Sequence, residues 1–369
     1  MKTIGSYLQL CVEEGAFPGA SWQIGTRDSV MEAGTVGTLG CGLGPVQADS
    51  LYDLASVTKI IVTCALMRQF QEGLVRLNDP IGRFLPTYQN HPKGAITLLE
   101  LLTHTSVIPG QLQLYRHAHS REDLLEAIRW QVPRADSPNR VAYTSKGYIL
   151  LGEAVAAIDG TTLDQVVCRR VLQPLQMNDT CFNPAKDLLG RIAPTENCPW
   201  RGHVVRGQVH DENAVVMGGI SGHAGLFSTA ADVSRIAAAM LGAPDTSTGA
   251  PFLHSAIIAL MTQNYTGGKG ENRGLGFLLA GPDSPAGDLM SPTSFGHTGF
   301  TGTSIWVDPE KQLYAVLLTN RIHPQRDNPA IFRVRQIFHN LAVLSYTYLS
   351  AALRCYNIGI NSQEGFAYG

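Results

Sequence analysis

Apolar and polar residues alternate in two regions that lie far apart in the sequence. A period of two predicts β-strands, because successive side chains of a strand point to opposite faces. Near the beginning of the chain the pattern predicts strands at 20–25 and 29–37, joined by a short turn. Near the end it predicts three more, at 294–298, 303–307 and 313–319. We therefore expect one sheet assembled from both ends of the chain.

Helical periods dominate the region between these strands. From Val57 to Gln71 apolar residues occur on most sides, so this helix should be central and buried, with Gly73 as its C-terminal cap. Other helices are expected where a capping residue precedes a periodic run. These are a short helix that a capping box of Thr97 and Glu100 opens, 121–132 after Ser120, and 146–158 after Ser145.

This order of elements indicates an α+β fold, with helices inserted beside a sheet. We expect a single catalytic domain over residues 1–345, with the sheet part at about 1–60 and 216–345 and the helical part at about 61–215. The active site should lie where the two parts meet. The remaining tail, 346–369, has no function that its sequence indicates.

Composition narrows the classes of partner and compartment. The chain has 369 residues, 44% of them hydrophobic and 16% charged, and a formal net charge of −2, which does not favour nucleic acid or an anionic membrane surface as a partner. No run of about 18 apolar residues predicts a membrane span. Seven cysteines without a C-x-x-C pair suggest neither a zinc cluster nor a disulfide framework. With no signal peptide evident at the N-terminus, we expect a cytoplasmic location.

Ser56 and Lys59 are the first candidates for chemistry. Three residues apart at the start of the central helix, their side chains should share one helix face. A serine hydroxyl needs a base within hydrogen-bond reach, and a desolvated lysine can supply one. Ser56 is therefore the candidate nucleophile and Lys59 its activator.

Two later segments extend this pair to a set of three motifs. Tyr143–Ser145 (Tyr-Thr-Ser) and His297–Gly299 (His-Thr-Gly) follow it in the order and approximate separation of penicillin-recognising serine hydrolases. On these residues, and on the signature-like segments 51–55 and 101–106, the chain resembles the superfamily of serine β-lactamases, penicillin-binding proteins and class C-like esterases. The resemblance runs from about residue 15 to about 344. It implies a β-lactamase/transpeptidase-like α/β fold of the α+β type, with an antiparallel sheet flanked by helices and an all-helical insertion.

The resemblance also implies roles for individual residues. Lys59 and Tyr143 would form the proton relay, either of them being the base, and Tyr143 would protonate the leaving group. The backbone amides of Ser56 and Phe300 would form the oxyanion hole. His297 would steer the Tyr143 hydroxyl or the substrate, with a charge that changes near neutral pH. Substrate-binding positions on the second and third motifs would be Ser145, Thr298 and Gly299.

Two positions depart from the family pattern. Ser145 stands where the second motif usually has Asn, and His297 stands where the third motif often has Lys. His at the third motif is common in esterase-like members, and both departures argue against efficient β-lactam hydrolysis.

The glycine-rich stretch 209–229 is predicted to be a loop near the cleft. It resembles a subgroup that includes amidases acting on N-acetylmuramic acid peptides, in which His210 and Asn213 would help to hold the substrate. No spaced ligand set accompanies these residues, so we expect no metal. No serine lies in a G-x-S-x-G motif, which disfavours the α/β-hydrolase class.

Taken together, these patterns predict a cofactor-free serine hydrolase that acts on an ester or amide through an acyl-enzyme. Its substrate would be a small molecule, with cell-wall-derived muropeptides as one candidate. Two alternatives stay open. One is a non-catalytic or weakly acylating ligand-binding protein that keeps the cleft, and the other is a β-lactamase. The sequence does not indicate the oligomeric state.

Overall fold

The main sheet of the protein joins the two ends of the chain. The computed structural model describes residues 3–110, 113–137, 139–282 and 284–363. The six strands of the main sheet are all antiparallel and have the order β2-β1-β11-β10-β9-β8. They are β1 (Gly19–Gly25), β2 (Val30–Gly37), β8 (Leu278–Leu279), β9 (Phe295–Thr298), β10 (Ser304–Asp308) and β11 (Leu313–Thr319). The five strands expected from alternation are confirmed, whereas the two-residue strand β8 is too short to produce a period.

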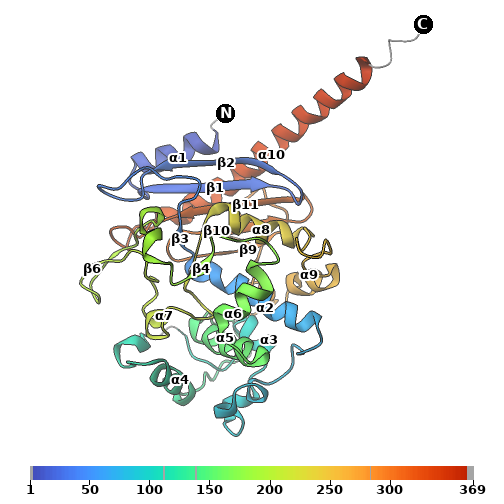
Figure 1. The fold of residues 1–369 in the computed structure, drawn as a ribbon. Helices are drawn as coiled ribbons and strands as arrows, with labels where there is room; N and C mark the ends of the chain where they lie inside the picture. Colours follow the sequence, from blue (N-terminus) through green and yellow to red (C-terminus); the bar gives the residue numbers. More distant parts are fainter. Residues whose placement is uncertain (1–2, 111–112, 138, 283, 364–369) are drawn as a thin grey trace.

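Helices cover both faces of this sheet, so its central strand β11 is buried along its whole length. Leu313, Ala315 and Leu317 pack into a core with α1 (Ile4–Glu13) and α10 (Ala330–Gln363). The alternate residues of the strand face the larger core, which contains α2 (Thr58–Gln71) and α8 (Ala230–Met240). Figure 1 shows the resulting layers, with α1 and α10 on one side of the sheet and α8 and α2 on the other.

The helical part lies beyond α2 and α8 (Figure 1). The predicted capping box of Thr97 and Glu100 is present, and a second one, of Ser120 and Asp123, opens the helix expected after Ser120. The helices of this part are α3 (Leu98–Leu102), α4 (Arg121–Trp130), α5 (Ser145–Asp159), α6 (Leu163–Val167) and α7 (Glu212–Val216). Helix α9 (Ser255–Thr262) lies nearer to the sheet, at the level of α8 and α2 (Figure 1). Single turns are η1 (Ala55–Val57), η2 (Ile81–Arg83), η3 (Pro86–Tyr88), η4 (Pro92–Ala95), η5 (Leu114–Arg116), η6 (Cys168–Leu172) and η7 (Lys186–Arg191).

Five short strands interrupt the region between the two halves of the main sheet. A small sheet has the order β3-β7-β4, and β5 pairs with β6. Strand β3 matters for function, because it ends two residues before η1 and fixes the direction in which the chain enters α2. The bounds are β3 (Tyr52–Asp53), β4 (Cys181–Phe182), β5 (Asn197–Cys198), β6 (His203–Val204) and β7 (Leu226–Ser228).

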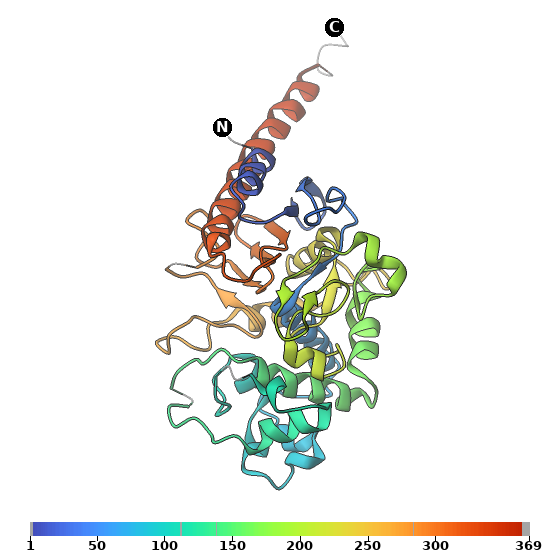
Figure 2. The ribbon, with the colours of Figure 1, turned by 90° about the vertical axis from the view of Figure 1, so that its left-hand side faces the viewer.

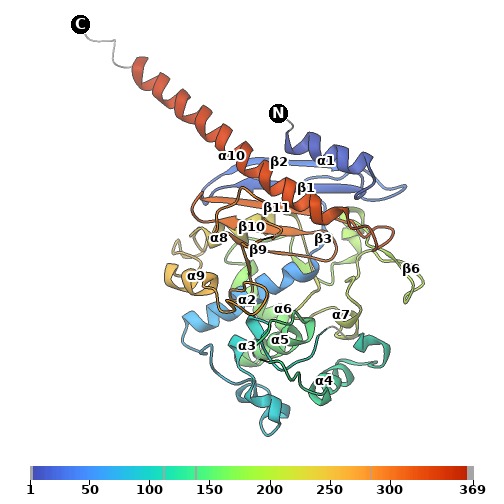
Figure 3. The same ribbon diagram turned by 180° about the vertical axis from the view of Figure 1, so that it is seen from behind.

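Helix α10 begins on the sheet and continues past it. Its buried residues Ile331, Val334, Phe338 and Ala342 recur every three or four positions, which is the period of a helix face. Figures 2 and 3 show α10 lying beside α1 and then projecting away from the body of the protein. The helix crosses residue 345 without a break, so the division into domain and tail stays a prediction. Among the described helices, none combines the length and hydropathy that a membrane span requires.

Candidate active site

Ser56 lies on the strained turn η1, at the entrance to α2. Ala55 just before it has a φ of +45°, which is costly for a residue with a Cβ. Side chains around the turn hold it in place. The buried Asp53 accepts the Ala55 N–H at 2.8 Å, and the Thr303 hydroxyl donates to the Leu54 carbonyl at 2.9 Å. The second contact ties the nucleophile turn to the loop between β9 and β10.

Gly299 makes this close approach possible. A Cβ on Gly299 would lie 2.5 Å from the Leu54 carbonyl oxygen and 2.0 Å from Thr303 Oγ1. Any side chain would therefore push the third motif away from the turn that carries Ser56. Gly299 therefore allows the third motif to pack directly against the turn that carries Ser56, in addition to any contact with substrate.

Lys59 makes the contact that its spacing predicts. Its Nζ lies 2.9 Å from Ser56 Oγ and donates to the His223 carbonyl at 3.1 Å. The lysine is fully buried on the first turn of α2. The amine is thus held by one backbone acceptor and aimed at the serine hydroxyl.

The Tyr143 ring lies close to both Lys59 and His297. Lys59 Nζ is 5.1 Å from its centroid, and the centroid of the His297 ring is 6.0 Å away. Tyr143 precedes α5 by two residues, as the sequence predicts. All three motifs therefore meet at Ser56, at the junction of the sheet and the helical part.

His104 is a positioning residue that the sequence analysis did not single out. Its Nδ1 accepts the Thr144 N–H at 3.3 Å, and its carbonyl accepts the Ala142 N–H at 2.9 Å, so it holds the chain on both sides of Tyr143. The His104 ring lies 4.5 Å from that of Tyr143. Its φ of +57° is unusual for a histidine and marks a constrained backbone. His104 could have been found from the sequence, because it lies in the signature-like segment 101–106.

His297 is a neutral hydrogen-bond acceptor in this site. Its Nδ1 lies 2.8 Å from the Thr298 carbonyl oxygen, which can only accept, so Nδ1 carries the proton. Burial lowers the pKa of His297 well below its ordinary value, and the charges of Arg273 and Lys59 lower it further. Nε2 is buried without a partner in the described structure, and its lone pair is free for a donor. The expectation that His297 changes charge near neutral pH is therefore wrong.

This protonation state predicts the pH profile. We expect kcat/KM of the wild type and of His297→Gln to fall in the same way on the acid side, because a histidine whose pKa lies well below its ordinary value does not ionise near neutral pH. The measurement is kcat/KM between pH 5 and 9 for both proteins on one ester. An acid limb near pH 6.5 in the wild type that disappears in His297→Gln would contradict the assignment.

Two hollows share Ser56, Tyr143 and Phe300 in their linings. The first, about 630 Å³, also contains His297, Thr298 and Gly299, and we call it the arginine hollow. The second, about 320 Å³, also contains Ser145 and His210, and we call it the His210 hollow. Ser56 can therefore meet a bond whose two sides occupy different spaces. Contacts of the substrate with Ser145, His210, Thr298 and Gly299 stay predictions.

The arginine hollow takes its name from Arg273, Arg321 and Arg335, which line it. Arg273 is paired with the Glu271 carboxylate. The hydrogen bonds of the other two go to backbone carbonyls: Arg321 Nε to Phe300, and Arg335 Nη2 to Gly299 and Thr303. Burial lowers the pKa of Arg335 to about 9, and the charge of Arg321 adds to this effect. Carbonyls do not cancel a positive charge, so this hollow favours an anionic group.

The Phe300 ring forms the wall between the two hollows. It stacks on His210 at 5.5 Å, and the Arg321 guanidinium lies 4.6 Å from its centroid. These contacts fix the chain directly after the third motif, where the backbone amide predicted for the oxyanion hole lies. The role of the Ser56 and Phe300 amides stays a prediction.

A buried chain of hydrogen bonds supports the acceptor of Lys59. His223 Nδ1 bonds Ser221 Oγ and Nε2 bonds Asp211 Oδ1, both at 2.8 Å. Burial would raise the pKa of Asp211, but the charge and hydrogen bond of His223 outweigh it and hold that pKa well below its usual range. Because His223 is fixed at both ring nitrogens, its carbonyl is fixed as well. The sequence analysis placed this segment near the cleft but gave His223 no role.

His210 and Asn213 have different surroundings. His210 lines its hollow, and its N–H donates to Asp53 Oδ2 at 2.6 Å. Asn213 lies within α7, where its Oδ1 accepts the Tyr115 N–H at 3.0 Å. Asn213 thus holds a neighbouring loop, and its contact with substrate stays a prediction.

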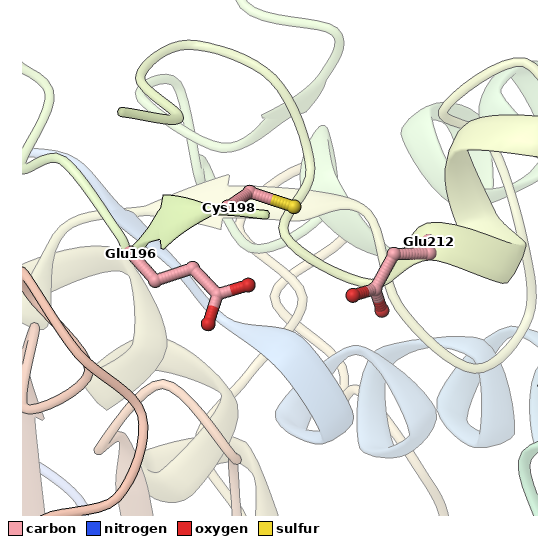
Figure 4. A group of neighbouring side chains, drawn as sticks. All are labelled: Glu196, Cys198 and Glu212. Carbon is pink, nitrogen blue, oxygen red and sulfur yellow. The ribbon is translucent and has the colours of Figure 1, made fainter. Parts of the chain in front are cut away.

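One group of side chains has the composition of a metal site. Glu196, Cys198 and Glu212 point toward a common space in Figure 4, with ligand atoms within 4.8 Å of one another. The Arg326 guanidinium donates to the carboxylates of both Glu196 and Glu212. Since an arginine already supplies the cation there, these residues do not fit a metal ion in this arrangement.

Solved structures of other proteins share this fold. The fold matches the hydrolase EstCE1, which has promiscuous acyltransferase activity (TM-score 0.72, 19% identity, covering 91% of this chain and 96% of that one). It also matches a class C β-lactamase from Rhodobacter sphaeroides (TM-score 0.71, 19% identity, 92% and 98%).

At the sequence level, a protein of Escherichia coli K12 named "Putative D-alanyl-D-alanine carboxypeptidase" is 32% identical over 333 residues, which cover 79% of this chain and 75% of the relative. The sequence model of the family described as Beta-lactamase matches residues 5–338. That match contains all three motifs that meet at Ser56, and the chain belongs to the beta-lactamase family, a family of the serine-hydrolase type.

Proposed function

We propose that the protein is a serine hydrolase that cleaves an amide or ester bond beside a free carboxylate, through an acyl-enzyme on Ser56. The observation that carries the proposal is the 2.9 Å contact of Lys59 Nζ with Ser56 Oγ in a cleft lined by three arginines. The first feature supplies an activated nucleophile, and the second supplies recognition of an anion. The name of the Escherichia coli relative describes a bond of this kind, next to a C-terminal carboxylate.

The acylation step follows from the contacts of Lys59. Lys59 Nζ is held by the His223 carbonyl and lies 2.9 Å from Ser56 Oγ, within reach of the hydroxyl proton. Ser56 Oγ attacks the substrate carbonyl as its proton passes to Lys59, or to Tyr143 if that residue is the base. Tyr143 then protonates the leaving amine or alkoxide, and water releases the acyl group from Ser56 by the reverse transfers.

His297 adds a selective contact to this scheme. A lysine at its position would offer a cation, whereas neutral His297 offers an acceptor at Nε2. The arginine hollow would then hold the carboxylate, while Nε2 accepts an N–H of the substrate or the Tyr143 hydroxyl. The arginines would thus recognise the charge of the substrate, and His297 would recognise the region of the bond that is cleaved.

A pair of substrates tests the proposal. We expect an N-acetylated tripeptide that ends in D-alanyl-D-alanine to be cleaved at least about tenfold faster, in kcat/KM, than the same peptide with a C-terminal amide, because an ion pair to arginine is worth more than about 1.4 kcal/mol when it is partly desolvated. Arg321→Met should reduce this preference, whereas Arg27→Met, at an exposed turn, should leave it unchanged. Equal rates for the two peptides would contradict recognition of a carboxylate. Turnover of a neutral ester alone would leave esterase activity as the function.

A further inference from the structure

A third hollow, of about 1010 Å³, continues the cleft away from the arginine hollow. It shares Glu212 and Arg326 with the His210 hollow, which in turn shares Ser56 with the arginine hollow. We call it the distal hollow. The three spaces therefore form one path, with the nucleophile between its two ends.

A rigid aromatic platform borders the distal hollow. Trp200, between β5 and β6, is 45% exposed, and the Tyr115 ring meets it edge-on at 5.1 Å. The Arg201 guanidinium lies 5.2 Å from the Trp200 centroid and donates to the carbonyls of Val209 and His210. Trp200 is thus anchored to the segment that lines the site at Ser56. An exposed tryptophan held this firmly is preorganised to bind a ligand.

Arg326 lines both the His210 hollow and the distal hollow. It is held between Glu196, which is buried, and Glu212. Three exposed amide side chains, those of Gln113, Asn197 and Gln325, also line the hollow. The distal hollow therefore combines aromatic surface, planar amides and the paired charges of Arg326, Glu196 and Glu212.

We infer that the distal hollow binds a sugar ring that is joined to the substrate cleaved at Ser56. A pyranose has apolar C–H faces that pack on aromatic rings, and a rim of hydroxyl or acetamido groups that bond to amides and carboxylates. The ionisable side chains of the lining are of both signs, Arg116 and Arg326 with Glu196, Glu212 and Asp327, so the charge of the hollow favours neither a cation nor an anion over a neutral ring. The inference rests on the proposed function, since it assigns the far part of the same substrate.

Binding to the platform can be measured without turnover. With N-acetylglucosamine trimer as the probe, we expect saturable quenching of tryptophan fluorescence in the wild type and its loss in Trp200→Ala. Trp130→Ala is the matched control, because Trp130 is 65% exposed but lies on α4 and lines none of the three hollows. Quenching that survives in Trp200→Ala, or binding of tetra-alanine in place of the sugar, would overturn the inference.

Kinetics separate this inference from the proposed function. We expect Trp200→Ala to lower kcat/KM at least about tenfold, mainly through KM, for a peptide substrate that carries an N-acetylated amino sugar, and to leave a short p-nitrophenyl ester unchanged. An equal loss on both substrates, or no loss on either, would overturn the distal subsite. Failure of the wild type to hydrolyse the short ester would instead count against the serine-hydrolase mechanism.

Discussion

Ser56→Ala is expected to reduce kcat by about 10⁴- to 10⁶-fold, because it removes the hydroxyl that we propose forms the covalent bond to the substrate. The variant should fold normally, since the hydrogen bond of Ser56 Oγ within the described part of the chain is the one with Lys59. The measurement is hydrolysis of a short p-nitrophenyl ester by wild type and variant prepared in parallel, with thermal unfolding as the check on folding.

Ser145→Ala is the matched comparison. Its side chain lines the same hollow, but Lys59 does not contact it in the described hydrogen bonds. We expect a much smaller loss, confined to substrate contacts. Similar losses in both variants would mean that the hollow needs hydroxyl groups in general, and Ser56 would not be the nucleophile.

Lys59→Met is expected to reduce kcat by about 10²- to 10⁴-fold, the usual contribution of a positioned general base. The methionine keeps the length of the side chain but removes the amine that contacts Ser56 Oγ. Stopped-flow acylation by the same ester should show that the loss lies in formation of the acyl-enzyme. An unchanged acylation rate would leave Tyr143 as the base.

Lys93→Met provides the control for removing a buried amine. Lys93 is also almost fully buried, and its Nζ donates to three carbonyls at the end of α4, those of Ile128, Arg129 and Gln131. Removing it leaves these acceptors without their donor and should lower the unfolding temperature. The kcat should stay near that of the wild type, because Lys93 lines neither hollow at Ser56.

The fold was predictable from sequence where a period is long enough to be read. Alternation over 313–319 and the apolar helix after Ser56 both have physical signals, and the structure confirms them. Strands β3, β4 and β7 have only two or three residues each. They form by pairing with segments that are distant in the sequence, so no local pattern of residues predicts them. Helix α8 was missed although Thr229 and Asp232 mark its start and its buried residues, among them Val233, Ile236 and Met240, recur every three or four positions.

The site was predictable only in its local part. The spacing of Ser56 and Lys59 fixes their contact within one helical turn, so the sequence suffices. The supports of that pair come from distant segments: Asp53 joins the nucleophile turn to His210, and the His223 carbonyl holds Lys59. Tertiary packing alone brings these together. The protonation state of His297 likewise depends on burial and on Arg273, neither of which a sequence motif specifies.

The central claim is that Ser56 carries the acyl group, and rapid quenching with mass spectrometry tests it most directly. After mixing with a p-nitrophenyl ester, the wild type should gain one acyl mass, located on the peptide that contains Ser56. Ser56→Ala should gain none under the same conditions. An acyl group on any other residue of the wild type, or an equal mass gain in Ser56→Ala, would contradict the mechanism.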